Sequence, residues 1–490
     1  MLTGFSPSSL PFSAPPHADA PDSWVDRLLL AGPGGEECLH LGAPLDRDAL
    51  RTLVDEQAAQ LTATGLGPGG TVALRLPPSV AFVAALLACW RLGAQVALLD
   101  HRLTDHEVDA AVARLAPQVL VGSAHRPAAA LRGFSVVEPV AVRLPDGRPA
   151  RTGHALVQLS SGSTGPAKVI ARTASDLLRE LDCYRRLADV RDAPGSAARP
   201  GSPGFPGEGE RVVLLSSVVH VLGLVGGLLN SLYARAALTV PERMTAAGIL
   251  AAVAAGERPT TLIGVPFHAE LLAGAAAPPP LPQLRRMVVA GELVRPGLPA
   301  LFTARYGVPL GTMYGMTETG VIATDLDGTL HPAKRPVHGM RLRLVGGELR
   351  IGAAASPYPG LDDPTRWSNG WLHTRDAAEL DEATGHVTVL GRLDSQVSIG
   401  GLKVDLTEVE QTLTALPAVR EAVVVFEDGA IEAYLATEPD ADLASVQDGI
   451  TRRLAGYKRP RRLALLPHLP RTATGKLLRD PAALRGAAAR

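Results

Sequence analysis

Residues 160–168 carry the residue types of a phosphate-binding loop. They read SSGSTGPAK, so hydroxyls, glycines and one ammonium group share nine positions. Backbone N–H groups in such a loop suit a polyphosphate, and glycines let the backbone approach an anion closely. The pattern GxxxxGK[ST] of a Walker A loop is absent. The segment predicts a polyphosphate site, and its alternative is an ordinary Ser/Gly turn. The candidate contact residues are Ser160, Ser161, Gly162, Ser163, Thr164, Gly165 and Lys168.

Four further segments follow this loop along the chain. They are MYGMTE (313–318), GWLHTRD (370–376), GRLDSQVSIGGLKVDLTEVE (391–410) and RTATGK (471–476). With the loop they resemble the adenylate-forming superfamily of acyl-CoA synthetases, peptide-synthetase adenylation domains, luciferases and amide bond synthetases. The resemblance covers essentially the whole chain. It implies an enzyme that converts a carboxylic acid and ATP, with Mg²⁺, into an acyl-adenylate and pyrophosphate.

The matching positions acquire roles from this resemblance. Glu318 supplies a hard oxygen ligand suited to Mg²⁺ on the ATP phosphates. Asp376 resembles the carboxylate that accepts hydrogen bonds from both ribose hydroxyls, for which two charge-assisted bonds are well suited. Lys476 resembles the catalytic lysine, whose ammonium group offsets charge developing during attack. The other residues implied to bind the nucleotide are Gly291, Glu292, Tyr314, Gly315, Met316, Thr317 and Arg392.

Two positions bear on the local geometry of this predicted site. Asp394 lies where the family has its interdomain hinge, which needs only a few residues able to absorb large backbone changes. Arg375 stands where the family usually has glycine directly before the ribose aspartate. Either the local turn differs, or Arg375 adds a charge near the nucleotide.

The segment SSVVHVLG indicates the class of acid. His220 aligns with the region that closes the acyl pocket, and the alternative for it is a satisfied core histidine. Residues 216–219 offer no aspartate to pair with a substrate ammonium group, and an unpaired buried ammonium is costly. An α-amino acid is therefore disfavoured. The glycines that follow are expected to leave room for a flat or bulky acyl group; they are Gly223, Gly226 and Gly227.

The acyl acceptor is predicted to be an amine. Coenzyme A ligases commonly have Gly-Val after the loop lysine, whereas Val169-Ile170 follows Lys168 here, and Leu406-Thr407 replaces the usual proline before the EVE segment. With LLDHRLT (98–104), these features resemble the amide bond synthetases of natural-product pathways. The alternatives are CoA or a carrier-protein thiol, and more remotely a non-catalytic nucleotide-binding protein. An oxidoreductase is disfavoured because no GxGxxG follows a strand with an acidic residue about 20 positions later.

These residues must be positioned by an α/β fold. Strand and helix patterns alternate from residue 24 to about 320, which predicts mainly parallel, doubly wound sheets covered by helices. From about Val321 to Leu390, short strands and turns predict a small β subdomain. We expect a large N-terminal domain (1–393) for acid and ATP, and a small mobile α+β domain (394–490) that carries Lys476.

Composition limits the partners and the compartment. The 48 Lys and Arg against 49 Asp and Glu give a net charge of −1, so a nucleic acid partner is not expected. The three cysteines show no CxxC spacing, which disfavours a disulfide framework or a structural zinc site. The first 24 residues lack a secretory pattern, and no apolar run is long enough to cross a bilayer. We expect a cytoplasmic protein with no membrane partner.

Overall fold

The computed structural model describes residues 24–103, 105–124, 132–159, 169–187, 205–276, 278–393, 396–399, 402–427, 429–438, 441–454, 456–472 and 475–489. The predicted phosphate loop (160–168) and the predicted hinge residue Asp394 lie outside this set. The backbone of Arg392 is described, but its side chain is not. Within the described residues, no helix combines the length and the hydrophobicity needed to cross a membrane.

Two large sheets build most of the N-terminal part. The first has the strand order β6-β5-β3-β4-β7-β8, and the second has the order β15-β14-β13-β12-β11-β9-β10-β1-β2. The inner strands run parallel and the outer ones antiparallel, as the alternating pattern predicts. Their bounds are β1 (Glu37–His40), β2 (Pro44–Asp46), β3 (Thr71–Arg75), β4 (Gln95–Leu98), β5 (Val119–Ser123), β6 (Pro139–Arg143), β7 (His154–Leu159), β8 (Val169–Thr173), β9 (Arg211–Leu214), β10 (Ala237–Thr239), β11 (Thr260–Gly264), β12 (Leu284–Val289), β13 (Leu310–Met316), β14 (Gly320–Asp325) and β15 (Arg335–Pro336).

Helices cover these sheets because their apolar residues face the strands. Helix α2 is buried from Phe82 to Trp90 and begins where the Ser79 hydroxyl accepts from the Phe82 N–H. Helix α4 begins with a capping box between Thr173 and Asp176. The helices of this part are η1 (Val25–Leu29), α1 (Arg47–Ala63), α2 (Val80–Arg91), α3 (Asp105–Leu115), α4 (Ala174–Arg186), η3 (Leu222–Leu229), α5 (Asn230–Tyr233), α6 (Ala246–Ala254), α7 (Pro266–Ala273) and α8 (Leu298–Tyr306).

A third, five-stranded antiparallel sheet forms the small β subdomain. Its strands are β16 (Leu342–Val345), β17 (Glu348–Gly352), β18 (Trp367–Ser368), β19 (Trp371–Leu380) and β20 (Val387–Arg392). The expected start of this subdomain near Val321 is wrong. Strand β14 pairs with β13 instead and buries all six of its residues in the nine-stranded sheet.

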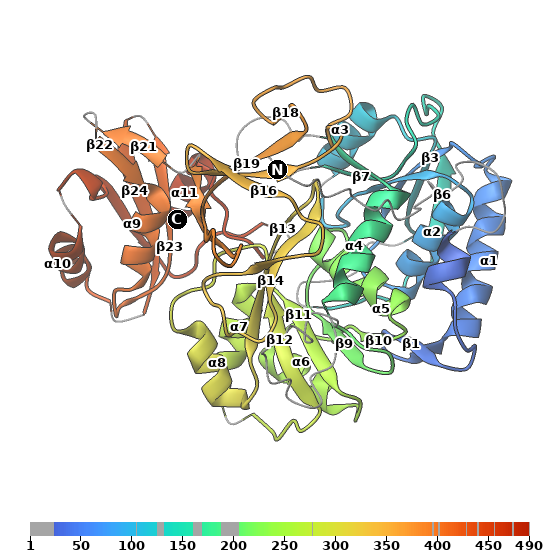
Figure 1. Ribbon diagram of the computed structural model, residues 1–490, viewed down its shortest axis with the longest axis horizontal. Helices are drawn as coiled ribbons and strands as arrows, with labels where there is room; N and C mark the ends of the chain where they lie inside the picture. Colours follow the sequence, from blue (N-terminus) through green and yellow to red (C-terminus); the bar gives the residue numbers. More distant parts are fainter. Residues whose placement is uncertain are drawn as a thin grey trace, which may run out of the picture.

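The C-terminal elements form sheets and cores of their own and lie to one side of the molecule (Figure 1). One sheet pairs β21 with β22, and the other has the order β23-β24-β25. These elements are β21 (Gln396–Ile399), β22 (Leu402–Asp405), α9 (Leu406–Thr414), β23 (Val419–Glu427), β24 (Ala430–Thr437), α10 (Leu443–Arg453), η5 (Gly456–Lys458), β25 (Arg462–Leu466) and α11 (Pro481–Ala488). The mixed α/β architecture predicted from the sequence is confirmed.

Candidate active site

The hairpin β13–β14 presents the MYGMTE motif. Gly315 and Met316 end strand β13, and Thr317 and Glu318 lie in the turn before Gly320. Gly320 has a φ of 80°, and a β-carbon added there would lie 2.1 Å from the Glu180 carboxylate. Because only glycine fits this conformation and this space, the turn is fixed against helix α4.

Tyr314 and Asp376 meet although 62 positions separate them in the sequence. The Tyr314 hydroxyl donates to Oδ2 of Asp376 at 2.5 Å. Asp376 is buried, and its N–H donates to the Thr374 hydroxyl at 3.0 Å. Arg392 pairs with Asp376 in register across β19 and β20. The structure therefore brings together the residues expected at the adenine and the ribose.

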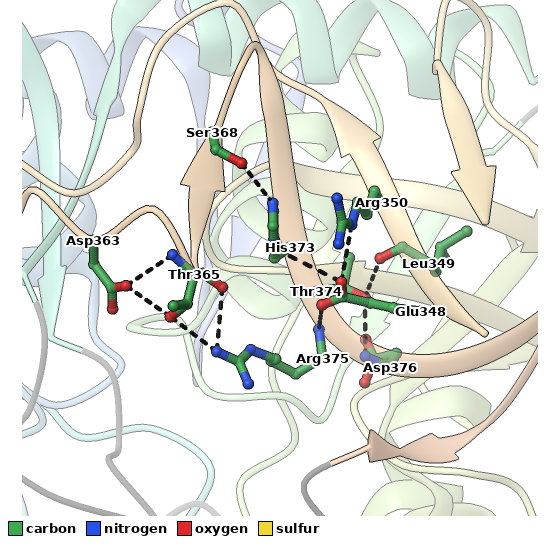
Figure 2. A network of polar contacts seen from close by, with 10 residues as sticks. All are labelled: Glu348, Leu349, Arg350, Asp363, Thr365, Ser368, His373, Thr374, Arg375 and Asp376. Carbon is green, nitrogen blue, oxygen red and sulfur yellow. Dashed lines mark hydrogen bonds and ion pairs between the residues drawn. The ribbon is translucent and has the colours of Figure 1, made fainter. Parts of the chain in front are cut away.

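Arg375 resolves the question that the sequence left open about this turn. Its φ is 61°, the left-handed conformation that costs a non-glycine residue about 1–2 kcal/mol. Its N–H donates to Oε1 of Glu348 at 3.2 Å, and its guanidinium group donates to the carbonyl and hydroxyl of Thr365 at 3.2 and 3.0 Å. The glycine-like turn is thus retained, and the guanidinium group is directed to Thr365 (Figure 2).

Glu318 accepts a hydrogen bond that sequence reasoning missed. The Tyr358 hydroxyl donates to Oε1 of Glu318 at 2.8 Å. Burial, and secondly the Glu318 charge, raise the pKa of Tyr358, so this hydroxyl keeps its proton. In the described part of the chain, no three His, Cys, Asp or Glu side chains are grouped to hold a metal. A single carboxylate nevertheless fits Mg²⁺, which proteins often bind through one or two carboxylates and substrate phosphates.

Lys476 lies beside the Gly291-Glu292 segment. A β-carbon added to Gly291 would lie 3.8 Å from Nζ of Lys476. Burial raises the pKa of Glu292, and Lys476 opposes this effect. Burial, and next the Lys476 charge, lower the pKa of His220 to about 4. Glu292 and His220 are both solvent-exposed.

The loop that carries Lys476 is held mainly by its own segment. The N–H of Thr472 donates to the Lys476 carbonyl at 2.7 Å, and the N–H of Gly475 donates to the Thr472 carbonyl at 3.0 Å. The Arg471 guanidinium pairs with Glu421 and also lies 4.8 Å from the ring centroid of Phe267 on helix α7. This cation–π contact links the lysine loop to the N-terminal part.

The two strands that flank the predicted phosphate loop are anchored by buried side chains. On β7, Gln158 donates to the carbonyl of Val219, next to His220, at 2.7 Å. On β8, Arg172 donates to Oε2 of Glu180 at 2.6 Å, and Oε1 of Glu180 accepts the N–H of Val321 at 3.1 Å. Burial raises the pKa of Glu180, and Arg172 opposes this. These contacts hold strand β7 beside Val219, and strand β8 beside helix α4, which in turn bonds strand β14.

The three glycines after His220 do not leave space for an acyl group. An added β-carbon would lie 2.2 Å from the Ser217 carbonyl at Gly223, 2.8 Å from the Tyr184 hydroxyl at Gly226 and 2.7 Å from Leu214 at Gly227. The glycines allow helix η3 to pack closely, so the expectation of open space there is wrong. Leu224 of this helix and residues beside the helix belong to one apolar cluster, which also includes Val218, Val219, Ala290, Met313 and Val321.

The comparisons with known proteins agree with these observations. The AMP-binding enzyme family matches residues 44–354, which is more than half of the chain, and the AMP-binding enzyme C-terminal domain matches residues 408–476. The chain belongs to the AMP-binding enzyme family. It is thereby a member of the adenylate-forming superfamily that the five motifs resemble.

Three similar proteins illustrate this AMP-binding family. The probable non-canonical nonribosomal peptide synthetase CymA of Salinispora arenicola is 30% identical over 88% of this chain and 6% of CymA. The p-hydroxybenzoic acid–AMP ligase FadD22 of Mycobacterium tuberculosis is 30% identical over 85% of this chain and 61% of FadD22. The chain thus spans less than two thirds of either relative. The crystal structure of the anthranilate CoA ligase AuaEII with anthranoyl-AMP shares the fold, with a TM-score of 0.74, 20% identity, and coverage of 93% of this chain and 96% of AuaEII.

Proposed function

We propose that this protein is an ATP-dependent acid ligase that forms an acyl-adenylate and transfers the acyl group to a thiol. The arrangement of three distant segments supports the proposal. Tyr314 bonds Asp376, and Lys476 lies against Gly291 beside Glu292. These are the groups expected at the base, the ribose and the reacting carboxylate.

The residues divide the first step among them. Asp376 and Tyr314 would hold the ribose and the base, and Glu318 would hold Mg²⁺. The metal offsets phosphate charge when bound. Lys476 supplies a positive charge where the acid attacks the α-phosphate. His220 is neutral at pH 7 because its pKa is about 4, so it contacts the acid by hydrogen bonding or shape and not by charge.

A small aryl acid fits the site best. Beside the apolar cluster at helix η3, the buried Glu180 carboxylate is paired with Arg172 and is therefore not available to a substrate ammonium group. Asp100 lies near His220 but accepts two side-chain bonds from Arg102, at 2.9 and 2.8 Å. The names of FadD22 and AuaEII give p-hydroxybenzoic acid and anthranilate as the acids of those proteins.

A thiol acceptor replaces the amine expected from the sequence. That expectation depended on Val169-Ile170 after Lys168 and on Leu406-Thr407, which are weak motifs. AuaEII is named as a CoA ligase, and CymA as a probable non-canonical nonribosomal peptide synthetase. CoA and a carrier protein present the same phosphopantetheine thiol, so one acceptor chemistry serves both.

The test follows products separately. Purified protein receives MgATP and one of a panel of aryl and alkyl acids, with CoA, with a phosphopantetheinylated carrier protein, or with amines. Mass spectrometry then quantifies thioester and amide. We expect saturable thioester formation with an aryl acid. Saturable amide formation, with thioester only at the uncatalysed rate, would restore the amine acceptor, and absence of acid-dependent pyrophosphate release would refute the ligase itself.

A further inference from the structure

Residues 353–366, between β17 and β18, contact each side of the candidate site. The Pro357 carbonyl accepts the N–H of Ala171 on β8 at 2.9 Å. Tyr358 bonds Glu318, and Thr365 accepts from Arg375 next to Asp376. One connecting loop therefore joins the strand after the predicted phosphate loop, the Glu318 turn and the ribose carboxylate.

At the phosphate end, the loop contributes Tyr358 as a fixed donor. Its side chain is 4% exposed and packs in the cluster that also contains Ile170 and Ile322. The hydroxyl reaches Oε1 of Glu318 at 2.8 Å. A donor held this way fixes the orientation of the carboxylate and leaves Oε2 for another ligand.

At the ribose end, the loop is fastened through Arg375. The Asp363 side chain accepts from the N–H and hydroxyl of Thr365 at 2.9 and 2.7 Å, which orders the turn that receives the guanidinium group. Arg375 is also held by Glu348, whose other oxygen accepts from Arg350 at 3.0 Å (Figure 2). A strained backbone conformation persists only where its surroundings determine it this fully.

We propose that residues 353–366 act as a brace, with Tyr358 positioning Glu318 and Arg375 positioning Asp376 for the nucleotide. Neither positioning residue needs to touch the substrate. The inference builds on the proposed function, since it assigns Glu318 to the metal and phosphates and Asp376 to the ribose. The brace gives the arginine at position 375 a function, although glycine would adopt the same backbone conformation without strain.

Tyr358→Phe tests the phosphate end, and Tyr306→Phe is its matched control. The Tyr306 hydroxyl also donates one hydrogen bond, to the Leu272 carbonyl at 2.7 Å, in another core cluster. Binding of a non-hydrolysable ATP analogue is measured by calorimetry with and without Mg²⁺. We expect Tyr358→Phe to weaken Mg²⁺-dependent binding about 10-fold, as loss of a bond to a charged group predicts. Binding within twofold of the control would overturn this half of the brace.

A double-mutant cycle separates positioning from general stability. If Tyr358 acts through Glu318, Tyr358→Phe changes analogue binding less than twofold in a Glu318→Ala background, which has no side-chain acceptor for the hydroxyl. An undiminished 10-fold loss there would overturn the assignment to Glu318.

Arg375→Gly tests the ribose end, because glycine removes both the strain and the guanidinium bonds. The brace predicts about fivefold weaker AMP binding, whereas a turn that merely tolerates arginine predicts equal or tighter binding, which would refute the brace. These are binding measurements, so they remain decisive if the protein transfers no acyl group. If wild-type protein binds neither AMP nor the analogue, the proposed function itself fails.

Discussion

Replacing Glu180 by glutamine removes one charge from a buried ion pair and changes little else in shape. The side chains of Glu180 and Arg172 are 2% and 3% exposed, and Oε2 of Glu180 lies 2.6 Å from Nη1 of Arg172. Glutamine retains a carbonyl for the N–H of Val321 but removes the carboxylate that is hydrogen-bonded to the Arg172 guanidinium. Breaking such a pair costs about 3–5 kcal/mol.

Urea unfolding followed by tryptophan fluorescence measures this loss. The four tryptophans, at positions 24, 90, 367 and 371, all precede the C-terminal elements, so the signal reports the part that contains the pair. Asp182→Asn is the control on the same helix, because Asp182 pairs with Arg185 and Arg186 at the surface. Its expected cost is about 0.5 kcal/mol.

Function supplies a second readout of the same change. Glu180 holds Arg172 after the predicted phosphate loop and packs against Gly320 after the Glu318 turn. We therefore expect Glu180→Gln to raise KM for MgATP more than KM for the acid. The reasoning fails if Glu180→Gln lowers the unfolding free energy by less than about 1 kcal/mol, a loss no larger than that of Asp182→Asn. That result would mean that Glu180 and Arg172 do not form a charged pair.

Two further predictions concern single ionisable groups. Lys476→Ala should reduce acid-dependent pyrophosphate release about 10²–10³-fold with little change in unfolding free energy; near-normal release would show that the lysine is not catalytic. Burial lowers the pKa of His268 to about 4, from about 6.5 when unfolded, so stability is complete above pH 6.5 and is lost as pH falls towards 4. The loss between pH 7 and pH 5 is about 2 kcal/mol. His268→Gln, whose side-chain oxygen can accept the Val265 N–H as Nδ1 does, should lack this pH dependence; an unchanged slope would contradict the assignment.

The sequence predicts local elements and motif residues better than it predicts the contacts between them. The alternation of strand and helix patterns correctly predicts mainly parallel sheets covered by helices, since each element depends on periodic burial along a short segment. The motifs also identify Tyr314, Asp376, Gly291 and Lys476, and the fold brings Tyr314 to Asp376 and Lys476 to Gly291. The roles of these residues are inferred from the resemblance of the motifs to the adenylate-forming superfamily, and not from periodicity.

The missed contacts leave no such pattern. Tyr358 lies 40 positions from Glu318 and outside the five motifs quoted from the sequence. The sequence predicts that residues near Val321 belong to the small β subdomain, whereas strand β14 pairs with β13. A short apolar run does not reveal which strand it will pair with, because tertiary packing decides the pairing. The glycines of η3 were misread for a related reason: a missing side chain can admit either a ligand or a neighbouring element, and here Tyr184 and Leu214 occupy the space.

The contacts around Lys476 bear on the proposed mobility of residues 394–490. The loop's own bonds, from Thr472 to Lys476 and from Arg471 to Glu421, lie within the C-terminal elements. Arg471 meets the N-terminal part at Phe267 through a cation–π contact, which contributes about 0.5–1 kcal/mol at a partly exposed site. Glu421 also acts as a like charge on Glu270 across the same boundary. Because these bonds lie within the C-terminal elements, the proposed movement of residues 394–490 would carry Lys476 away from the N-terminal part without rearranging the loop. That is the property an acid ligase needs if a thiol is to approach the carbonyl that Lys476 first covers.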